Sequence, residues 1–93
     1  MNNITIIGIG LIGSSLARAI KNHNPNVMIN IVDSSNENLK KSQNLSLANK
    51  YNIKINKEVE ESEVIFICTP ISAYENIFKD LSKLDLNKSI ITD

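Results

Sequence analysis

The three glycines of this chain are spaced in a pattern that allows the main chain to bind a ligand. Gly8, Gly10 and Gly13 are the only glycines among the 93 residues, and they directly follow the apolar stretch Ile4–Ile7. In a turn from a strand into a helix, this GxGxxG spacing permits a tight turn, a close approach of the main chain to a ligand, and close packing of the helix on the strand. The pattern predicts a main-chain cradle for two linked phosphates, as in a dinucleotide.

The helix after the glycines would complete this cradle. Its first N–H groups, from about Leu11 and Ile12, have no partner inside the helix. These groups and the positive end of the helix dipole attract an anion. The alternative is a strand-to-helix turn that binds no ligand.

A carboxylate stands at the position where such a site needs a second contact. Asp33 closes the apolar stretch Val27–Val32 and follows Gly13 by twenty residues, where this fold has the acidic group that binds the adenosine ribose. Ser34 follows at the same strand end. Because a carboxylate repels a 2′-phosphate, and residues 34–38 include no Arg or Lys to neutralise one, the expected cofactor is NAD rather than NADP. The alternative is that Asp33 only caps the next helix.

Two further residues are expected at this cleft. Thr69 and Pro70 follow the apolar stretch Val64–Cys68 and would line the cleft from the neighbouring strand, unless they only begin a helix. No catalytic residue is predicted, because His23 falls after the first helix, at the sheet end opposite the glycine turn. No metal site is predicted either, because the acidic residues between 58 and 63 have no His or Cys beside them.

The elements that position these residues alternate between strand and helix. Apolar stretches predict strands at 4–7, 27–32, 53–55, 64–68 and 89–92. Helices are expected after the glycine turn, over about 36–47 and over about 71–81. In the first helix, the apolar stripe is expected to comprise Ile12, Leu16, Ala19 and Ile20. Right-handed crossovers then give an α/β fold, a Rossmann-type doubly wound parallel sheet of about five strands in the order 3-2-1-4-5, with helices on both faces.

Length and charge narrow the class of protein. The 93 residues make one small domain, and a formal net charge of zero with interspersed charges gives no basic face for nucleic acid. No apolar run is long enough to cross a bilayer, and the start lacks the order of a signal peptide. A single cysteine cannot form an internal disulfide. These features predict a soluble, cytoplasmic protein that binds neither nucleic acid nor a membrane.

Three motifs resemble one enzyme family. The residues from Ile6 to Ala17, Ile-Ile-Gly-Ile-Gly-Leu-Ile-Gly-Ser-Ser-Leu-Ala, resemble the opening of prephenate (or arogenate) dehydrogenases, which usually have a glycine where Ser14 stands. The stretch from Val64 to Ser72 resembles the fourth strand of that family, and Ile90–Asp93 resembles its strand ending in Thr-Asp. The resemblance covers the whole chain. It implies the NAD-binding domain of an oxidoreductase that decarboxylates prephenate oxidatively, in tyrosine biosynthesis.

The family continues past the position of Asp93 with a Gly-Ser-Val-Lys-like loop, a catalytic histidine and a helical dimerisation domain. The resemblance therefore implies that residues 1–93 form a dinucleotide-binding domain without the catalytic and dimerisation domain. Catalytic competence and a small-molecule substrate are expected only in a full-length parent. Alternatives are the NAD-binding domain of a β-hydroxyacid dehydrogenase-like or imine reductase-like enzyme, against which Leu11-Ile12 argues mildly, and a non-catalytic nucleotide-binding module.

The last predicted strand has a consequence for association. Residues 89–92 would form an edge of the sheet with unpaired N–H and C=O groups. The isolated chain is therefore expected to self-associate through this strand and to gain stability when NAD is added.

Overall fold

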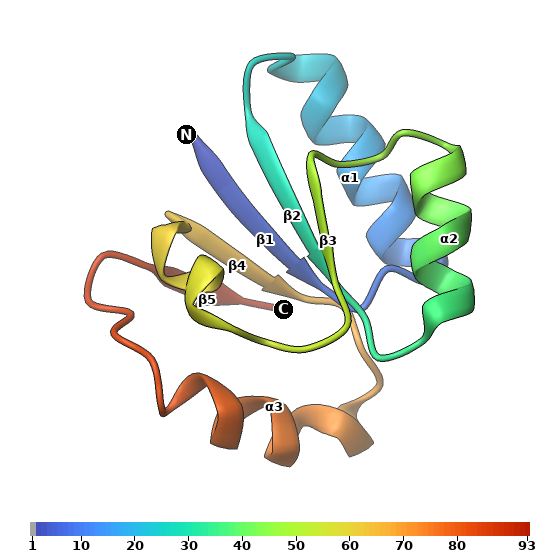
Figure 1. Ribbon diagram of the computed structural model, residues 1–93. Helices are drawn as coiled ribbons and strands as arrows, with labels where there is room; N and C mark the ends of the chain where they lie inside the picture. The colour runs from blue at the N-terminus through green and yellow to red at the C-terminus, as the bar shows by residue number, and fades with distance from the viewer. Residues whose placement is uncertain (1) are drawn as a thin grey trace.

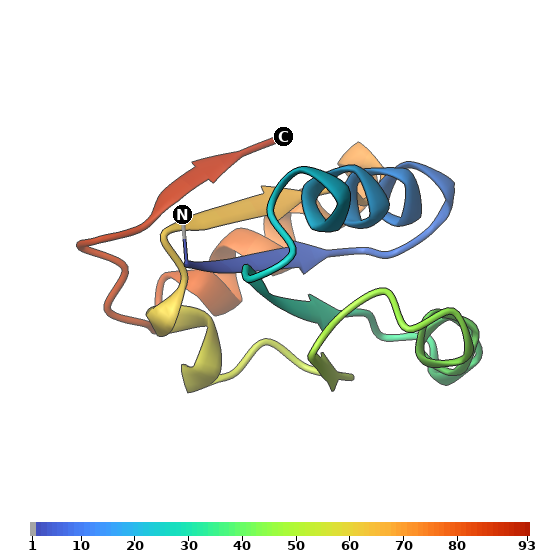
Figure 2. The ribbon, with the colours of Figure 1, turned by 90° about the horizontal axis from the view of Figure 1, so that it is seen from above.

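The computed structural model describes residues 2–93, which form one parallel sheet in the order β3-β2-β1-β4-β5. The strands are β1 (Asn3–Ile7), β2 (Met28–Val32), β3 (Lys50–Asn52), β4 (Val64–Ile67) and β5 (Ile90–Thr92). Helices α1 (Leu11–His23) and α2 (Asn36–Asn44) cover one face (Figure 1). The other face carries α3 (Tyr74–Leu81) and the 3₁₀ turns η1 (Lys57–Glu61) and η2 (Ile71–Ala73) (Figures 1 and 2). The predicted fold class and strand order are confirmed.

Two apolar layers, one on each face of the sheet, hold these elements together. The layer under α1 and α2 contains Ile4, Ile6, Ile9, Ala17, Val27, Ile29, Ile31, Leu39 and Leu47. The layer under η1 and α3 contains Ile7, Val32, Val59, Ile65, Ile67, Ile77 and Leu81. Successive side chains of a strand point to opposite faces, so a strand covered on both faces is apolar throughout. This is why the central strands could be recognised as continuous apolar stretches.

A glycine seats α1 against the sheet. A Cβ on Gly13 would collide with the carbonyl oxygen of Gly8, so the two backbones can approach this closely only without one. Gly13 and Ala17 are the buried residues of α1. Ile12 and Ala19 are exposed, so the predicted stripe of this helix is wrong at these two positions. The physical reason is that small residues, rather than an apolar side chain at 12, face the sheet.

The third strand lies earlier in the chain than predicted. β3 pairs with β2 through Asn30 and Lys50, Ile31 and Tyr51, and Val32 and Asn52. The pairing ends there, because the N–H of Asp33 donates to the carbonyl of Asn52 at 3.0 Å and the chain then leaves the sheet for α2. The predicted strand at Ile53–Ile55 is therefore wrong. These residues lie beyond the end of β2 and form a loop toward η1.

Two helices also differ from their predicted bounds. α2 ends at Asn44, and Ser46 then adopts a left-handed φ of 53°, which turns the chain back toward β3. At the other end of α2, Ser35 accepts the N–H of Asn38 on its Oγ at 3.2 Å and so caps the helix. The segment predicted as one helix over 71–81 consists of η2 followed by α3.

Buried polar side chains attach η1 and its preceding loop to the sheet. The hydroxyl groups of Thr5 and Ser62 share a hydrogen bond of 2.5 Å, and Asn30 donates to the Thr5 hydroxyl at 3.3 Å. Asn52 in turn donates to Asn30 at 2.9 Å. Because Thr5 and Ser62 are almost completely buried, these bonds strongly favour one position of the end of η1 on the sheet.

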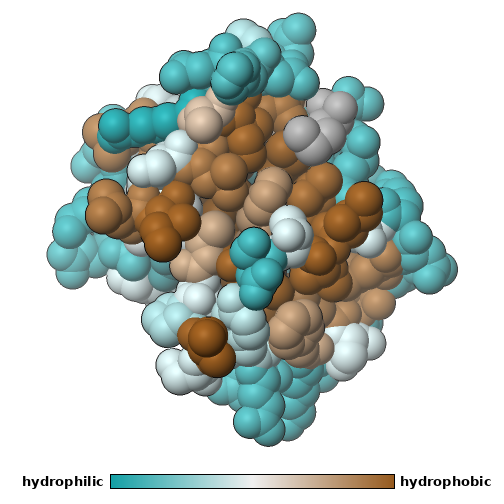
Figure 3. Space-filling model, turned by 180° about the vertical axis from the view of Figure 1, so that it is seen from behind, coloured by the Kyte–Doolittle hydropathy of each residue, from teal (hydrophilic) through white to brown (hydrophobic). Residues whose placement is uncertain are grey.

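The sheet edge at β5 carries apolar side chains that reach the surface. Ile90 is 67% exposed and Ile91 is 39% exposed. Hydrophobic residues gather on this side of the molecule, in the region between α1 and β5 (Figure 3). β5 pairs with β4 alone among the strands of residues 2–93, which leaves its outer edge open.

None of the helices in the described part of the chain has the length and hydrophobicity to cross a bilayer. The longest, α1, has 13 residues. A spanning helix needs about 20 apolar residues.

Candidate functional site

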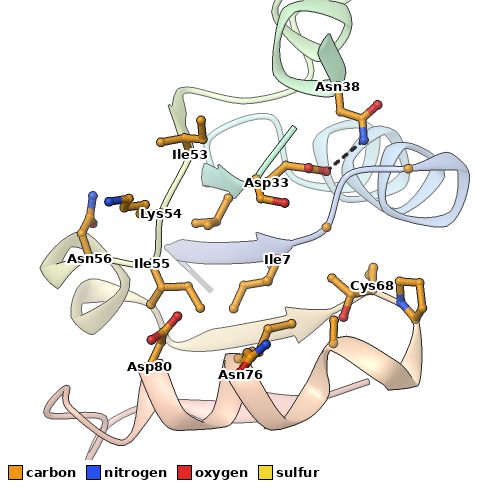
Figure 4. Close-up of a pocket in the computed structure, with 18 of the residues that line it drawn as sticks. Ile7, Asp33, Asn38, Ile53, Lys54, Ile55, Asn56, Cys68, Asn76 and Asp80 are labelled. Atoms are coloured by element: carbon orange, nitrogen blue, oxygen red, sulfur yellow. Dashed lines mark hydrogen bonds between the residues drawn. The ribbon is translucent and has the colours of Figure 1, made fainter. Parts of the chain in front are cut away.

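A cleft of about 1060 Å³ opens at the carboxyl ends of β1, β2 and β4 (Figure 4). Open parallel sheets bind ligands at this end, where the strand order reverses between β1 and β4. Six of the residues predicted from the sequence line the cleft: Gly8, Gly10, Asp33, Ser34, Thr69 and Pro70. Leu11 and Ile12 begin α1 with exposed side chains, and Gly13 lies beneath the turn against Gly8.

Gly8 makes the tight turn out of β1. Its φ is +89°, a conformation that residues with a side chain rarely adopt. A Cβ there would lie 2.5 Å from Cγ2 of Thr69 and 3.1 Å from its main-chain nitrogen. The N–H of Gly8 donates to the carbonyl of Val32 at 2.7 Å, so the turn begins while the chain is still bonded to β2. The first glycine is therefore required by the protein itself.

Gly10 differs, because packing within the protein does not require it. A Cβ on Gly10 would meet no atom within 4 Å. Within the described chain no side chain caps α1, so the N–H groups of its first turn are not covered by a cap. Gly10 thus borders open space at the positive end of a helix. This is the arrangement expected where a phosphate approaches the main chain.

Asp33 connects the glycine turn to the start of α2. Its Oδ2 accepts the N–H of Ile9 at 2.9 Å, and its Oδ1 accepts the N–H of Ser35 at 2.8 Å. The side-chain amide of Asn38 donates to Oδ2 at 3.3 Å. Because Ser35 caps α2, the alternative that Asp33 is the helix cap is wrong. The half-buried carboxylate lies in the wall of the cleft (Figure 4).

Thr69 brings an unpaired hydroxyl group to the cleft. Its Oγ1 is buried and has no hydrogen-bond partner among the described residues. Leaving such a group unpaired costs about 1–3 kcal/mol, so a polar ligand group within reach would be stabilising. Pro70 follows at the surface and precedes η2. Beside them, burial raises the pKa of the Cys68 thiol.

The cleft extends further than the sequence predicted. It continues between residues 53–57, which are the loop before η1 and the first residue of η1, and the face of α3 that carries Asn76, Ile77 and Asp80. Ile7 and Ile55 point into this part (Figure 4). The loop was missed because its alternating residues were interpreted as a strand. Asn38 was missed because an asparagine within a helix gives no signal by itself, and only the fold brings it to Asp33.

The other titratable groups lie elsewhere. His23 is the last residue of α1, and its side chain is exposed. Because α1 starts after the carboxyl end of β1 and returns the chain to the start of β2, His23 lies at the end of the sheet opposite the cleft, as predicted. Among residues 2–93, no group of three or more His, Cys, Asp or Glu is arranged to hold a metal ion. At the glycine turn the candidate site offers main-chain N–H groups, the carboxylate of Asp33 and small polar side chains, and elsewhere the cleft is also lined by Asp80 and by the lysines at 54, 57 and 83. Such a site binds and orients a phosphorylated ligand.

A family model agrees with this geometry. The model described as NADP oxidoreductase coenzyme F420-dependent matches residues 3–93. The chain belongs to this family. Two curated relatives support the narrower resemblance. The chain is 37% identical to cyclohexadienyl dehydrogenase of Zymomonas mobilis over 71 residues, which are 76% of this chain and 24% of the relative. It is 32% identical to prephenate dehydrogenase of Lactococcus lactis over 94 aligned positions, covering all of this chain and 26% of the relative.

Solved structures are similar over the whole chain. Prephenate dehydrogenase of Aquifex aeolicus, in complex with hydroxyphenyl propionate and NAD⁺, superimposes with a TM-score of 0.89 at 24% identity, over 100% of this chain and 33% of that one. Synechocystis arogenate dehydrogenase gives 0.81 at 25% identity, over 98% and 32%. The chain thus spans about a quarter to a third of the length of these proteins. The predicted resemblance to the prephenate dehydrogenase family is confirmed for this portion.

Proposed function

We propose that residues 1–93 form a dinucleotide-binding domain that holds NAD for an oxidoreductase similar to prephenate dehydrogenase. The observation that carries the proposal is the open space at Gly10, between the uncapped first turn of α1 and the carboxylate of Asp33. The cofactor supplies the hydride-accepting ring, and the domain supplies binding and orientation. The NAD⁺ named for the Aquifex aeolicus complex supports this assignment.

The residues present fit the parts of such a cofactor. The N–H groups near Gly10, Leu11 and Ile12 would hold the pyrophosphate, since α1 begins there without a cap. Asp33 and Ser34 would face the adenosine ribose from the end of β2. Thr69 would offer its unpaired hydroxyl to the cofactor from the neighbouring loop, beside Pro70, and Gly8 and Gly13 would shape the turn.

NAD is favoured over NADP by the charge at the ribose end. Asp33 faces the cleft, and a phosphate about 4 Å from a carboxylate is repelled by about 4 kcal/mol at an effective dielectric constant of 20. Lys54 lines the same cleft from the loop after β3. A cationic side chain in the cleft would reduce this repulsion. NAD is therefore expected to bind at least about tenfold more tightly than NADP, a difference of about 1.4 kcal/mol.

Calorimetric titration of the 93-residue chain with NAD and NADP tests the proposal. The Asp33→Asn variant keeps the shape of the side chain and removes its charge. We expect the preference for NAD to shrink in this variant, because the repulsion of the 2′-phosphate is lost. NADP binding as tightly as NAD to the unmodified chain would contradict the assignment. Failure of both to bind at millimolar concentration would overturn the nucleotide function altogether.

The activity of a full-length parent belongs to the same proposal. A protein that joins this domain to the further parts present in its relatives would oxidise and decarboxylate prephenate with NAD, in tyrosine biosynthesis in the cytoplasm. The names of the curated relatives and of the solved structures support this activity. Residues 1–93 would contribute the cofactor-binding site, and the remainder of the parent would contribute the groups that bind the substrate and transfer protons.

Self-association through β5 is also part of the proposal. The outer edge of β5 has no strand beside it in residues 2–93, and Ile90 is largely exposed there. An open edge with apolar side chains is a template for pairing with a second strand.

A further inference from the structure

Asn38 is held next to the carboxylate that the proposed function assigns to the ribose. It is the third residue of α2, and the N-cap bond from its N–H to Ser35 anchors its main chain. Its side chain is half-buried and lines the cleft. The amide Nδ2 donates to Oδ2 of Asp33 at 3.3 Å (Figure 4). The amide therefore occupies part of the carboxylate surface that a ligand would need.

The acceptor sites of Asp33 can be counted. A carboxylate has about four lone-pair sites on its two oxygens. Three are engaged, by the N–H of Ile9 at 2.9 Å, the N–H of Ser35 at 2.8 Å and the amide of Asn38 at 3.3 Å. The two hydroxyl groups of a ribose diol need two sites, so one existing bond must yield. The bond of Asn38 is the longest and the only one made by a rotatable side chain.

We propose that Asn38 is a further ribose-binding residue, beside Asp33 and Ser34. It holds Oδ2 of Asp33 when the cleft is empty. When the diol takes the carboxylate, the 2′-hydroxyl inserts between the two side chains. This hydroxyl then donates its hydrogen to Asp33 and accepts one from the amide of Asn38. The inference rests on the proposed function, because it requires an adenosine ribose at Asp33.

The role of Asn38 can be separated from a structural one. Asp33 keeps its two shorter bonds to main-chain N–H groups when Asn38 loses its amide, so the carboxylate stays in place. The cap of α2 is made by the main-chain N–H of Asn38 and survives as well. A change at Asn38 should therefore affect a ligand that has the 2′-hydroxyl and leave a ligand without it almost unaffected.

The test uses ADP and 2′-deoxy-ADP, which differ only in this hydroxyl, titrated against the 93-residue chain. In the Asn38→Ala variant we expect ADP to bind about 2- to 5-fold more weakly, less than the value of a full hydrogen bond because the amide gives up its 3.3 Å bond to Asp33 when ADP binds, and 2′-deoxy-ADP to change by less than about twofold. The ratio of the dissociation constant of 2′-deoxy-ADP to that of ADP thus moves toward one. Asn38→Leu, which removes both N–H donors at a similar size and adds no charge beside Asp33, should also reduce this ratio.

Asn36→Ala is the matched control. Asn36 is the same residue type in the same first turn of α2, it is exposed, and it is not among the described residues that line the cleft. Its ratio should equal that of the unmodified chain. In NMR spectra, the side-chain amide of Asn38 should shift with ADP and not with 2′-deoxy-ADP.

Two results with the Asn38 variants would overturn the inference while the proposed function stands. Unchanged affinities for both ligands would leave Asn38 as a neighbour of Asp33 only. Equal weakening of the two ligands would mean that Asn38 acts through the fold. If the unmodified chain binds neither ADP nor NAD, the proposed function fails and this inference fails with it. Binding of both with an unchanged ratio refutes the inference alone.

Discussion

The glycines of the turn should be separable by substitution to alanine. Gly13→Ala places a Cβ against the carbonyl oxygen of Gly8, which is backbone and cannot move aside. Overpacking of this kind costs about 1–3 kcal/mol. Alanine gains up to about 1 kcal/mol of helix propensity over glycine in α1, which offsets only part of this cost. The expected net loss is about 1–2 kcal/mol, or roughly 4–15 °C in Tm for a domain of this size.

Gly10→Ala should have the opposite effect, with little loss of stability and a large loss of NAD affinity. Its Cβ meets no atom within 4 Å, so no overpacking is expected, and the poorer N-cap costs about 0.5–1 kcal/mol. The added methyl group occupies space that the pyrophosphate would need. NAD affinity should fall by at least about tenfold, which corresponds to 1.4 kcal/mol.

Thermal unfolding followed by circular dichroism and calorimetric titration with NAD measure the two effects. Ser15→Ala, at an exposed position of the same helix, is the control and should change neither. A folded Gly10→Ala variant that binds NAD like the unmodified chain would refute the cradle at this position. A Gly13→Ala variant with an unchanged Tm would refute the argument that α1 needs a glycine to reach the sheet.

Three further outcomes are expected. Thr69→Val removes the unpaired hydroxyl, so the Tm of the domain should not fall. The affinity for NAD should drop by about 2- to 10-fold, the value of one hydrogen bond, and an unchanged affinity would exclude this contact. Burial raises the pKa of Cys68, so less thiolate is present at neutral pH, and alkylation by iodoacetamide should accelerate at a higher pH than for an exposed cysteine. The alkylation should also slow when NAD fills the cleft that Cys68 lines, and equal rates with and without NAD would contradict this. Ile90→Lys puts a charge on the open edge of β5, so sedimentation should show less self-association of this variant than of the unmodified chain. If the unmodified chain is itself monomeric, pairing through β5 is refuted.

Local patterns were enough for the central strands and for the glycine turn. Strands β1, β2 and β4 contribute to the apolar layers on both faces of the sheet and are therefore mostly apolar, although β1 includes Thr5 and β2 includes Asn30. The glycines mark a turn whose geometry excludes side chains at Gly8 and Gly13. The place of Asp33 at the cleft could be predicted from its distance along the chain to that turn, because one helix and one strand separate the two in this fold.

Elements with weak local signals depended on their neighbours. Ile53–Ile55 alternates like a strand, yet β3 lies at Lys50–Asn52, where β2 offers partners for hydrogen bonds. The side of α1 that faces the sheet was decided by how closely Gly13 can approach Gly8, and the apolar Ile12 stays in solvent. In both cases long-range contacts outweigh the pattern within the segment.

The order of the strands, the end of the sheet at which a ligand would bind and the residue types that face it could be inferred from spacing along the chain. Spacing carries this information because each crossover returns the chain to the same edge of a parallel sheet. Which atoms meet at that edge depended on the folded structure. The bonds of Asp33 to Ile9 and Asn38 join residues that lie on different elements, and the unpaired hydroxyl of Thr69 becomes visible only once the sheet has closed around it.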